Sequence, residues 1–354
     1  MISSHPGQFR AAQFTREGGP LEIKTVEWHD PKEGEVIIKV EACGLSSTDL
    51  ITRNNLLGDV VYPVGPGNTL YGKIVACGKL SKQDRHLKPG TRVCAVLPHD
   101  GLQEYACADA EQCCPIKHEV LDPLECCIAA WDGARVHASL RRFEREEKAL
   151  NKDERRRRER RNAKLGFLGD GVICIYGEGR FARFGLDILK KACCKSELVM
   201  LLSTSNRWTA QDYGIPERDM IDLTKQSVAD ELRKFGGAKL IIAVDQPVPQ
   251  PGLDTRFNGV CYGSQLVVLD PGKDGKIEFP AANLLVRNIS VRGPPVLTSY
   301  EMAECLAFFE QHNLGSRIKS RRFSFDEKHV NEAWRCVEEE GKELVAPVVV
   351  FQHQ

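Results

Sequence analysis

The chain has 354 residues, of which 42% are hydrophobic and 28% charged, and its 49 basic residues balance its 49 acidic ones. At about 150 residues a domain, this length predicts two domains, each large enough to bury a core. The composition excludes a disordered chain, and no apolar run approaches the ~20 residues that a membrane-spanning helix needs. The first residues, Met1 to Gly7, lack the basic and apolar regions of a signal peptide, so we expect a cytoplasmic protein without membrane contact.

The first 140 residues have the pattern of a β-rich domain, with short strands separated by turn signals. A β-branched run predicts a strand at 35–40. A Pro-Gly turn at 88–91 precedes a second run at 92–96.

From residue 172 the pattern changes to apolar runs that alternate with helical segments. We expect strands at 172–176, 198–203, 240–244 and 265–269, whose separations suit right-handed crossovers in a parallel sheet. This half of the chain is therefore α/β. The tail adds a helix at 299–311, a second amphipathic helix and a closing strand at 345–351.

The 14 cysteines include three adjacent pairs but no Cys-x-x-Cys. Their spacing is therefore not that of a zinc site or a disulfide framework. We expect most of them to be small buried side chains.

Between the two halves, the segment from Arg141 to Lys164 differs strongly in composition. It holds twelve basic and six acidic residues, a net charge of +6, so the rest of the chain carries −6. Its residue types favour helix, and Glu154 and Arg158 have the spacing of a stabilising i,i+4 pair. The plain interpretation is an exposed charged helix or a disordered loop; the sharper one is an electrostatic patch for nucleic acid, an anionic surface or an acidic partner. Since Phe143 is the only aromatic residue among the arginines, we do not expect nucleic acid as a partner.

A glycine-rich motif follows the expected strand 172–176 and opens a helix. Gly177 permits a tight reversal, Gly179 leaves room for a pyrophosphate at the backbone N–H groups, and Ala182 lets the helix pack on the strand. The N-terminus of the helix offers oriented donors to the phosphates. The motif predicts a dinucleotide-binding domain of the Rossmann type.

The end of the second strand of this domain predicts NADP(H) rather than NAD(H). Ser203, Ser205 and Arg207 lie where an acidic residue would accept hydrogen bonds from the adenine ribose of NAD(H). Hydroxyl groups and an arginine are instead what a 2′-phosphate requires. The alternative is that the serines only end the strand and Arg207 is solvated.

Several segments resemble motifs of a known superfamily. Residues 43–50, Cys-Gly-Leu-Ser-Ser-Thr-Asp-Leu, are similar to Cys-Gly-x-Cys-His-Thr-Asp, and residues 66–72 are similar to Pro-Gly-His-Glu-x-x-Gly. Residues 87–93, 101–105 and 325–334 add weaker matches. The chain thus resembles the medium-chain dehydrogenase/reductase superfamily, particularly its alcohol dehydrogenase-like and quinone oxidoreductase-like branches.

This resemblance implies an α/β protein with two domains. It implies a GroES-like β-rich catalytic domain at 1–140 and 297–354, a charged insert or linker at 141–165 and a Rossmann dinucleotide-binding domain at 166–296. It also suggests a homodimer formed through the dinucleotide-binding sheet.

The departures from the superfamily's motifs concern the metal. The positions of the zinc ligands in zinc-dependent members carry Ser46, Asn68 and Trp131, and Thr69 replaces the glutamate beside the histidine. A neutral hydroxyl, an amide and an indole cannot supply the thiolate and imidazole donors that hold zinc. We therefore predict a protein without zinc.

The resemblance and its departures together imply a zinc-independent, NADPH-dependent oxidoreductase that reduces a small organic carbonyl or activated alkene. Thr48 matches the superfamily's proton-relay hydroxyl, and Ser46 and Asn68 would orient a substrate oxygen beside it. Ser47 and Trp131 would line the substrate pocket. The alternative for Thr48 is a capping role at the start of the following segment.

Two other functions stay open at this point. One is a non-redox enzyme on the same scaffold, such as a cyclase, a dehydratase or an isomerase. The other is a catalytically silent nucleotide-binding protein that uses the basic segment to engage a partner.

Arg135 falls near the expected nicotinamide site, where a charge needs a partner or a cofactor phosphate.

Overall fold

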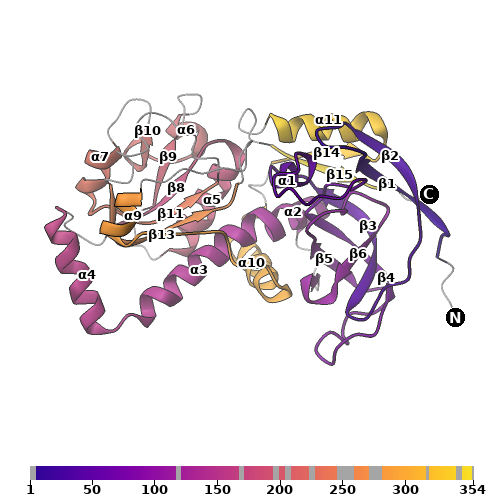
Figure 1. Ribbon diagram of the computed structural model, residues 1–354, viewed down its shortest axis with the longest axis horizontal. Helices are drawn as coiled ribbons and strands as arrows, with labels where there is room; N and C mark the ends of the chain where they lie inside the picture. Colours follow the sequence, from indigo (N-terminus) through magenta and orange to yellow (C-terminus); the bar gives the residue numbers. More distant parts are fainter. Residues whose placement is uncertain are drawn as a thin grey trace. The chain divides into compact units, whose positions relative to one another are not determined.

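The computed structural model describes residues 5–116, 121–166, 171–193, 199–203, 209–222, 228–244, 259–270, 281–315, 319–339 and 345–352. The chain divides into two compact units (Figure 1). Unit 1 is Met1–Ala134 with Val296–Gln354, and unit 2 is Arg135–Pro295. The basic segment that we expected as an insert or linker is therefore part of unit 2.

Unit 1 is built on a seven-stranded sheet and a separate two-stranded one. The long central strand β3 (Glu35–Gly44) pairs with three others, and the main path runs β14-β15-β3-β4-β5-β7, with β6 beside β3. The other strands are β1 (Gln8–Phe14), β2 (Leu21–Glu27), β4 (Thr69–Cys77), β5 (Arg92–Val96), β6 (Tyr105–Asp109), β7 (Cys113–Pro115), β14 (Ser320–Ser324) and β15 (Ala346–Val350). The helices are α1 (Asp49–Arg53), α2 (Pro123–Ile128), α10 (Ser299–His312) and α11 (Glu327–Glu338), with a short 3-10 helix, Ala110–Gln112.

The core of unit 1 follows from the residues that its strands turn inward. Val36, Ile38 and Val40 alternate along β3 and are fully buried, as expected for a strand with one face on a core. Helix α11 covers this core with Trp334, whose ring meets Phe14 of β1 edge to face at 5.0 Å. The tail of the chain thus completes the β-rich unit that begins at the N-terminus.

Unit 2 holds a parallel six-stranded sheet with the strand order β10-β9-β8-β11-β12-β13. Numbered within the unit, this order is 3-2-1-4-5-6, the order of the Rossmann fold. Its strands are β8 (Val172–Tyr176), β9 (Val199–Ser203), β10 (Met220–Asp222), β11 (Ala238–Ala243), β12 (Val260–Val268) and β13 (Ser290–Arg292). Its helices are α3 (Ala134–Ala149, which begins at the last residue of unit 1), α4 (Lys152–Lys164), α5 (Gly179–Ala192), α6 (Ala210–Tyr213), α7 (Val228–Lys234) and α9 (Ala281–Arg287), with a 3-10 helix, Glu217–Asp219.

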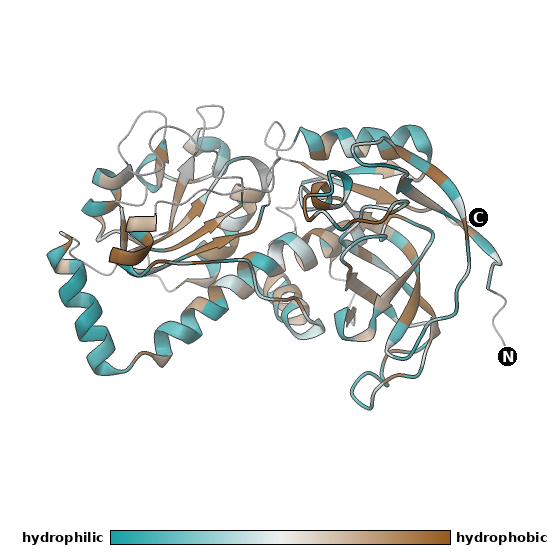
Figure 2. Ribbon diagram, viewed as in Figure 1, coloured by the Kyte–Doolittle hydropathy of each residue, from teal (hydrophilic) through white to brown (hydrophobic). Residues whose placement is uncertain are grey.

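The burial of strand β8 is that of a strand in the middle of a parallel sheet. All five of its residues are buried, which gives the continuous apolar run of a strand covered on both faces. Figure 2 shows the same hydrophobic colour along the strands of this sheet. The expected strands of this half and the expected helix at 299–311 are confirmed, with ends shifted by at most five residues.

A π-helical turn, Ala129–Gly133, separates α2 from α3. In such a turn one extra residue widens the helix, so the side chains that follow are rotated relative to a regular α-helix. Trp131 lies in this turn.

The basic segment is helical rather than disordered. It comprises the second half of α3, and α4 after a two-residue break. The pair expected between Glu154 and Arg158 is wrong: Glu154 accepts from the N–H of Asn151 in a capping box, and Arg158 pairs with Glu147 of α3. The capping box wins because it satisfies orphan N–H groups at the helix start.

Among the cysteines in the described residues, nine of thirteen are buried and none forms a disulfide, which confirms their expected role as small buried side chains. Across the part of the chain that the structure describes, no helix is both long and apolar enough to cross a membrane.

Candidate functional site

The segment that joins β3 to α1 carries the candidate catalytic residues of unit 1. Asp49, only 1% exposed, accepts hydrogen bonds from the N–H of Ser46 at 2.9 Å and of Gly67 at 2.7 Å. This carboxylate ties the loop before α1 to the turn before β4, which carries Asn68. Gly67 has a φ of +106°, and a Cβ there would lie 2.6 Å from the Cys43 sulfur, so the turn requires glycine.

The loop, the turn before β4 and the π-helical turn bring four of the predicted residues together. Thr48 Oγ1 lies 2.6 Å from Ser46 Oγ, 2.9 Å from Asn68 Oδ1 and 3.1 Å from Trp131 Nε1. We call Ser46, Thr48, Asn68 and Trp131 the hydroxyl–amide cluster. Its Ser46, Thr48 and Asn68 are at most 8% exposed.

The direction of each hydrogen bond in the hydroxyl–amide cluster can be derived. The Asn68 Nδ2 group donates to the carbonyl of Pro98 at 2.9 Å and to that of Leu97 at 3.4 Å, so Oδ1 faces Thr48 and accepts its proton. The single proton of Thr48 is thereby used. Ser46 must then donate to Thr48 Oγ1, as the indole N–H of Trp131 does, and both lone pairs of that oxygen are occupied.

Thr48 therefore does not cap α1. It occupies the N-cap position, but its side chain makes no capping hydrogen bond. Its hydroxyl is directed into the hydroxyl–amide cluster instead. Ser47, also predicted as a pocket residue, is buried beside it at 5% exposure.

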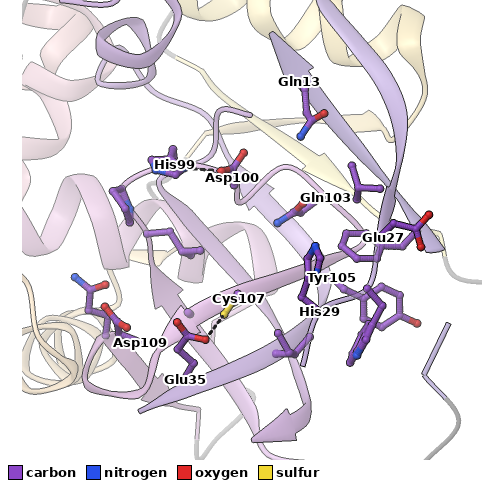
Figure 3. A pocket seen from close by; sticks show the side chains of 18 residues that line it. Gln13, Glu27, His29, Glu35, His99, Asp100, Gln103, Tyr105, Cys107 and Asp109 are labelled. Carbon is purple, nitrogen blue, oxygen red and sulfur yellow. Dashed lines mark hydrogen bonds and ion pairs between the residues drawn. The ribbon is translucent and has the colours of Figure 1, made fainter. Parts of the chain in front are cut away.

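Unit 1 contains a groove of about 530 Å³ whose lining does not include the residues of the hydroxyl–amide cluster. Figure 3 shows that it lies among β1, β2, β6 and the loop that contains His99. Its Cys107 sulfur contacts Glu35 at 3.4 Å, and burial together with that carboxylate raises the pKa of Cys107 to about 12. Its thiol is thus protonated and unsuited to nucleophilic attack. Leu97 and Pro98, whose carbonyls accept hydrogen bonds from Asn68, also line the groove.

The glycine-rich turn of unit 2 joins β8 to α5 as the sequence predicts. Gly177 and Gly179 have φ values of +136° and +77°, which glycine adopts without strain. Ala182 lies in the first turn of α5 and is fully buried. The turn lies beside β11, at the point where the strand order of the sheet reverses and ligands of such folds bind.

A tyrosine hydroxyl contacts the N-terminus of α5. The first turn of a helix has no intrahelical acceptors, and Glu178 at the N-cap makes no side-chain capping bond. The Gly179 N–H donates to the hydroxyl of Tyr213 at 3.0 Å. Tyr213 could not be predicted as a partner of Gly179 from the sequence, because 34 residues separate the two.

Arg135 contacts the same edge of the sheet. It is 3% exposed, donates from Nη1 to the carbonyl of Leu269 at 2.7 Å, and its guanidinium lies 5.3 Å from the ring centre of Phe181 in α5. A positive charge is thus buried between the end of β12 and the first turn of α5.

The residues predicted to hold a 2′-phosphate are only partly described. Ser203 ends β9, and its backbone is in register with Asp222 of β10. Ser205 and Arg207 lie outside the described residues.

Comparisons with known proteins agree with this architecture. Residues 32–121 match the alcohol dehydrogenase GroES-like domain family. The chain is 22% identical to the alcohol dehydrogenase patD of Penicillium expansum over 96% of its own length and 97% of that protein.

Two solved structures are similar over nearly their whole length. A cinnamyl alcohol dehydrogenase of Sorghum bicolor superposes with a TM-score of 0.71 at 16% identity, covering 97% of each chain. The rspB alcohol dehydrogenase of Escherichia coli CFT073, complexed with NADH, superposes with a TM-score of 0.68 at 16% identity, covering 98% of this chain and 100% of that one. The GroES-like residues, these relatives and the Rossmann strand order support the resemblance of the chain to the medium-chain dehydrogenase/reductase superfamily.

Proposed function

We propose that this protein is a zinc-independent, NADPH-dependent oxidoreductase that reduces a small organic carbonyl or an activated alkene. The similarity to alcohol dehydrogenases supports an oxidoreductase that uses a nicotinamide dinucleotide. The absence of zinc, the preference for NADPH and the class of substrate are our inferences. The hydroxyl–amide cluster is the observation that carries the inference about zinc and the class of substrate, whereas the preference for NADPH rests on Ser203, Ser205 and Arg207.

The atoms of the hydroxyl–amide cluster do not fit a zinc ion. Trp131 presents an N–H without a lone pair, and the other atoms belong to neutral hydroxyls and an amide. Zinc in proteins is held by thiolate, imidazole and carboxylate groups. Each polar atom that faces Thr48 is also used in a hydrogen bond to it, so the cluster stabilises itself without a metal.

The same geometry suits Thr48 as a proton donor. Hydrogen bonds from Ser46 and Trp131 to its oxygen stabilise negative charge there, which makes the hydroxyl a better acid. Asn68 Oδ1 accepts the proton at rest, and a substrate oxygen that replaced it would receive the proton instead. Without a metal to polarise the substrate, such donors must stabilise the developing oxyanion.

The residues that would hold the dinucleotide lie in unit 2. The glycine-rich turn with Gly177, Gly179 and Ala182 would receive the pyrophosphate at the start of α5. Ser203, Ser205 and Arg207 would bind the 2′-phosphate, and Arg135 adds a positive charge at the same edge of the sheet. When bound, NADPH supplies a hydride.

We further propose that the protein is a homodimer formed through β13. This strand ends the sheet of unit 2, so its outer edge has no partner strand among the described residues. Leu285 and Val286 of α9 and Val291 of β13 are 82%, 62% and 36% exposed. An unpaired edge with exposed apolar side chains is a surface on which strands of a second copy pair.

A nicotinamide fluorescence titration that compares NADPH with NADH tests the cofactor. We expect tighter binding of NADPH, and an Arg207→Glu variant should reverse the preference. A panel of carbonyls and enones, followed at the nicotinamide absorbance band, then tests turnover. Product formation without any change in that band would support the non-redox alternative, and binding without turnover of any substrate would support a silent nucleotide-binding protein.

The role of Thr48 has a matched test. Thr48→Val removes the hydroxyl at nearly constant shape, and loss of a proton donor lowers kcat about 100-fold or more. Thr48→Ser should restore most of it, and both variants should bind NADPH as the wild type does. Thr52→Val, the same change at another buried threonine of α1, is the control. Equal kcat in Thr48→Val and wild type, or stoichiometric zinc in active protein by elemental analysis, would overturn the proposal.

A further inference from the structure

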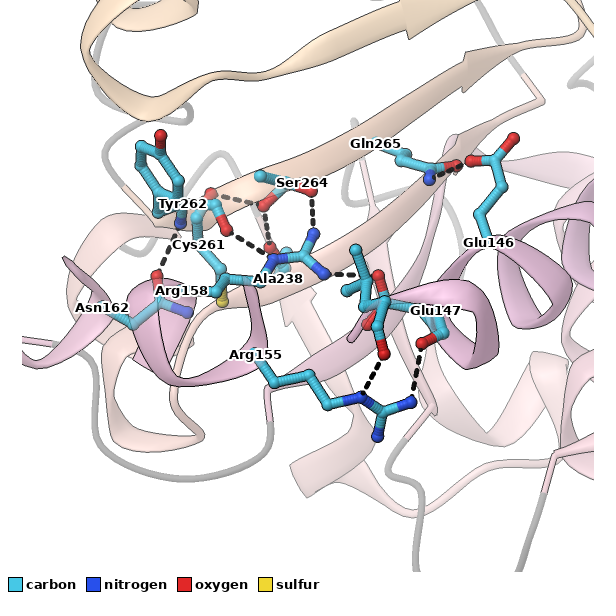
Figure 4. A network of polar contacts seen from close by, with 12 residues as sticks. Glu146, Glu147, Arg155, Arg158, Asn162, Ala238, Cys261, Tyr262, Ser264 and Gln265 are labelled. Atoms are coloured by element: carbon cyan, nitrogen blue, oxygen red, sulfur yellow. Dashed lines mark hydrogen bonds and ion pairs between the residues drawn. The ribbon is translucent and has the colours of Figure 1, made fainter. Parts of the chain in front are cut away.

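Helix α4 is fixed to unit 2 along one face. Arg158 donates to the carbonyls of Tyr262 and Gly263 in β12 and forms an ion pair with Glu147 of α3, as Figure 4 shows. Asn162 Oδ1, one turn further, accepts from the N–H of Tyr262 at 2.6 Å. These contacts hold α4 rigidly against the sheet.

The turn between α3 and α4 is fixed by a second arginine. Arg155 donates to the carbonyl of Leu150 at 3.1 Å and to that of Glu147 at 2.9 Å, which satisfies acceptors at the end of α3. The direction of α4 relative to α3 is thus set by charged side chains that contact backbone oxygens. The segment is a rigid platform within unit 2.

The opposite face of α4 carries a row of basic residues. Lys152, Arg156, Arg160 and Lys164 recur at every fourth position, so they lie on one side of the helix. All four are exposed, and their side chains form no hydrogen bond or ion pair with another residue in the described ranges. At 1.5 Å per residue the row is about 18 Å long. We call these four residues the basic row.

The charge of α4 as a whole favours an anion with many charges. The helix carries eight basic and three acidic residues, and Glu154 among the acidic ones is engaged in the capping box. Six of the eight basic residues are arginines, whose planar guanidinium groups bind phosphate in a bidentate manner. The rest of the chain is acidic, so a polyanion would be attracted to this helix and repelled elsewhere.

The exposed face of α4 lacks what other partners need. Figure 2 shows the helix as hydrophilic along its length, and it has no aromatic or large apolar side chain. A membrane-binding helix needs an apolar face, a protein interface needs buried anchors such as Trp, Tyr or Leu, and single-stranded nucleic acid needs aromatic platforms for its bases. A double helix needs none of these, because its backbone offers one phosphate per 3.4 Å on each strand.

We propose that the basic row of α4 binds the phosphate backbone of a double-helical nucleic acid, independently of base sequence and of the oxidoreductase activity. About 18 Å of helix spans about five phosphates of one strand, which matches four basic side chains. This departs from our expectation from the sequence, where the lack of aromatic residues argued against nucleic acid. The lack of aromatics excludes single strands, not duplexes.

Fluorescence anisotropy with the full chain tests the proposal, with a labelled 20-base-pair DNA duplex and an RNA duplex of the same sequence as separate probes. Four phosphate contacts predict a slope of log K against log salt near −3.6, so affinity falls about 150-fold between 50 and 200 mM KCl. Arg156→Gln with Arg160→Gln should halve the slope and lower affinity about 100-fold at 50 mM KCl. The DNA and RNA arms identify which duplex is preferred.

The control removes the same charge elsewhere. Lys82 and Arg85 are exposed residues of unit 1, and Lys82→Gln with Arg85→Gln should leave binding unchanged within twofold. If the first variant loses helix content by circular dichroism, Lys152→Gln with Lys164→Gln replaces it. The absence of duplex binding at 50 mM KCl, an equal loss in the control, or tighter binding to polyglutamate or to phosphatidylserine vesicles would overturn the proposal.

Discussion

Asp49→Asn tests whether one buried carboxylate holds the candidate catalytic residues together. The carboxylate accepts two backbone N–H groups, from Ser46 and Gly67. An amide can accept only one of them, and its NH2 group then faces the other donor. The substitution therefore leaves one buried N–H without an acceptor and weakens the second bond from a charged to a neutral one.

The expected loss follows from these two contacts. An unsatisfied buried donor costs about 1–3 kcal/mol, and replacing a charged by a neutral acceptor costs about 1 kcal/mol more. The sum, about 2–4 kcal/mol, lowers the melting temperature of a unit of this size by about 4–16 °C. Because the loop and the turn then separate, Thr48 should also lose its contact with Asn68, and kcat should fall while NADPH affinity stays constant.

The assay is thermal unfolding followed by calorimetry, with urea unfolding as a second measurement. Asp109→Asn is the matched control, since Asp109 is exposed and its side chain makes no hydrogen bond with a described residue. We expect the control to stay within about 0.5 kcal/mol of wild type. If Asp49→Asn also stayed within that range, the carboxylate would not be what joins the loop to the turn, and our account of the hydroxyl–amide cluster would fail.

Three further predictions concern other parts of the molecule. Burial and Arg141 lower the pKa of His137 from 6.5 to about 4, so the unfolded chain takes up a proton at a higher pH than the folded one. The free energy of unfolding should therefore fall by up to about 3 kcal/mol as the pH drops from 7 to 4. His137→Gln should remove this dependence in urea titrations. Leu285→Glu with Val291→Glu should convert the dimer to a monomer in light scattering, whereas a wild type that is already monomeric would contradict the proposed interface. Gly67→Ala should lower the free energy of unfolding by about 2–4 kcal/mol in urea titrations. Gly18→Ala should cost less, because φ is also positive there but no atom lies within 4 Å of the added carbon. Equal costs would refute the clash with the Cys43 sulfur.

The fold of unit 2 could be predicted because its signals are local. The apolar run of β8, the glycine-rich turn and the start of α5 are adjacent in the chain, and each requires only its neighbours to form. Their periodicity and turn residues carry the information that secondary structure needs. The strand order then follows from the handedness of the crossovers.

The contacts of the candidate sites could not be predicted to the same extent. Ser46, Asn68 and Trp131 were expected at one cavity from the resemblance, but the direction of their hydrogen bonds depends on the carbonyls of the loop after β5. The pairing of Arg158 with Glu147 depends on how tightly α4 folds back on α3. Such contacts are decided by tertiary packing, where several partners of similar energy compete.

The π-helical turn Ala129–Gly133 has a consequence for the indole of Trp131. A single extra residue rotates the helix by about 100°. Deleting one residue of this turn would restore a regular α-helix and swing the indole away from the Thr48 oxygen, which would then lack one of its two donors. The length of this turn therefore decides whether Thr48 keeps both of its hydrogen-bond donors.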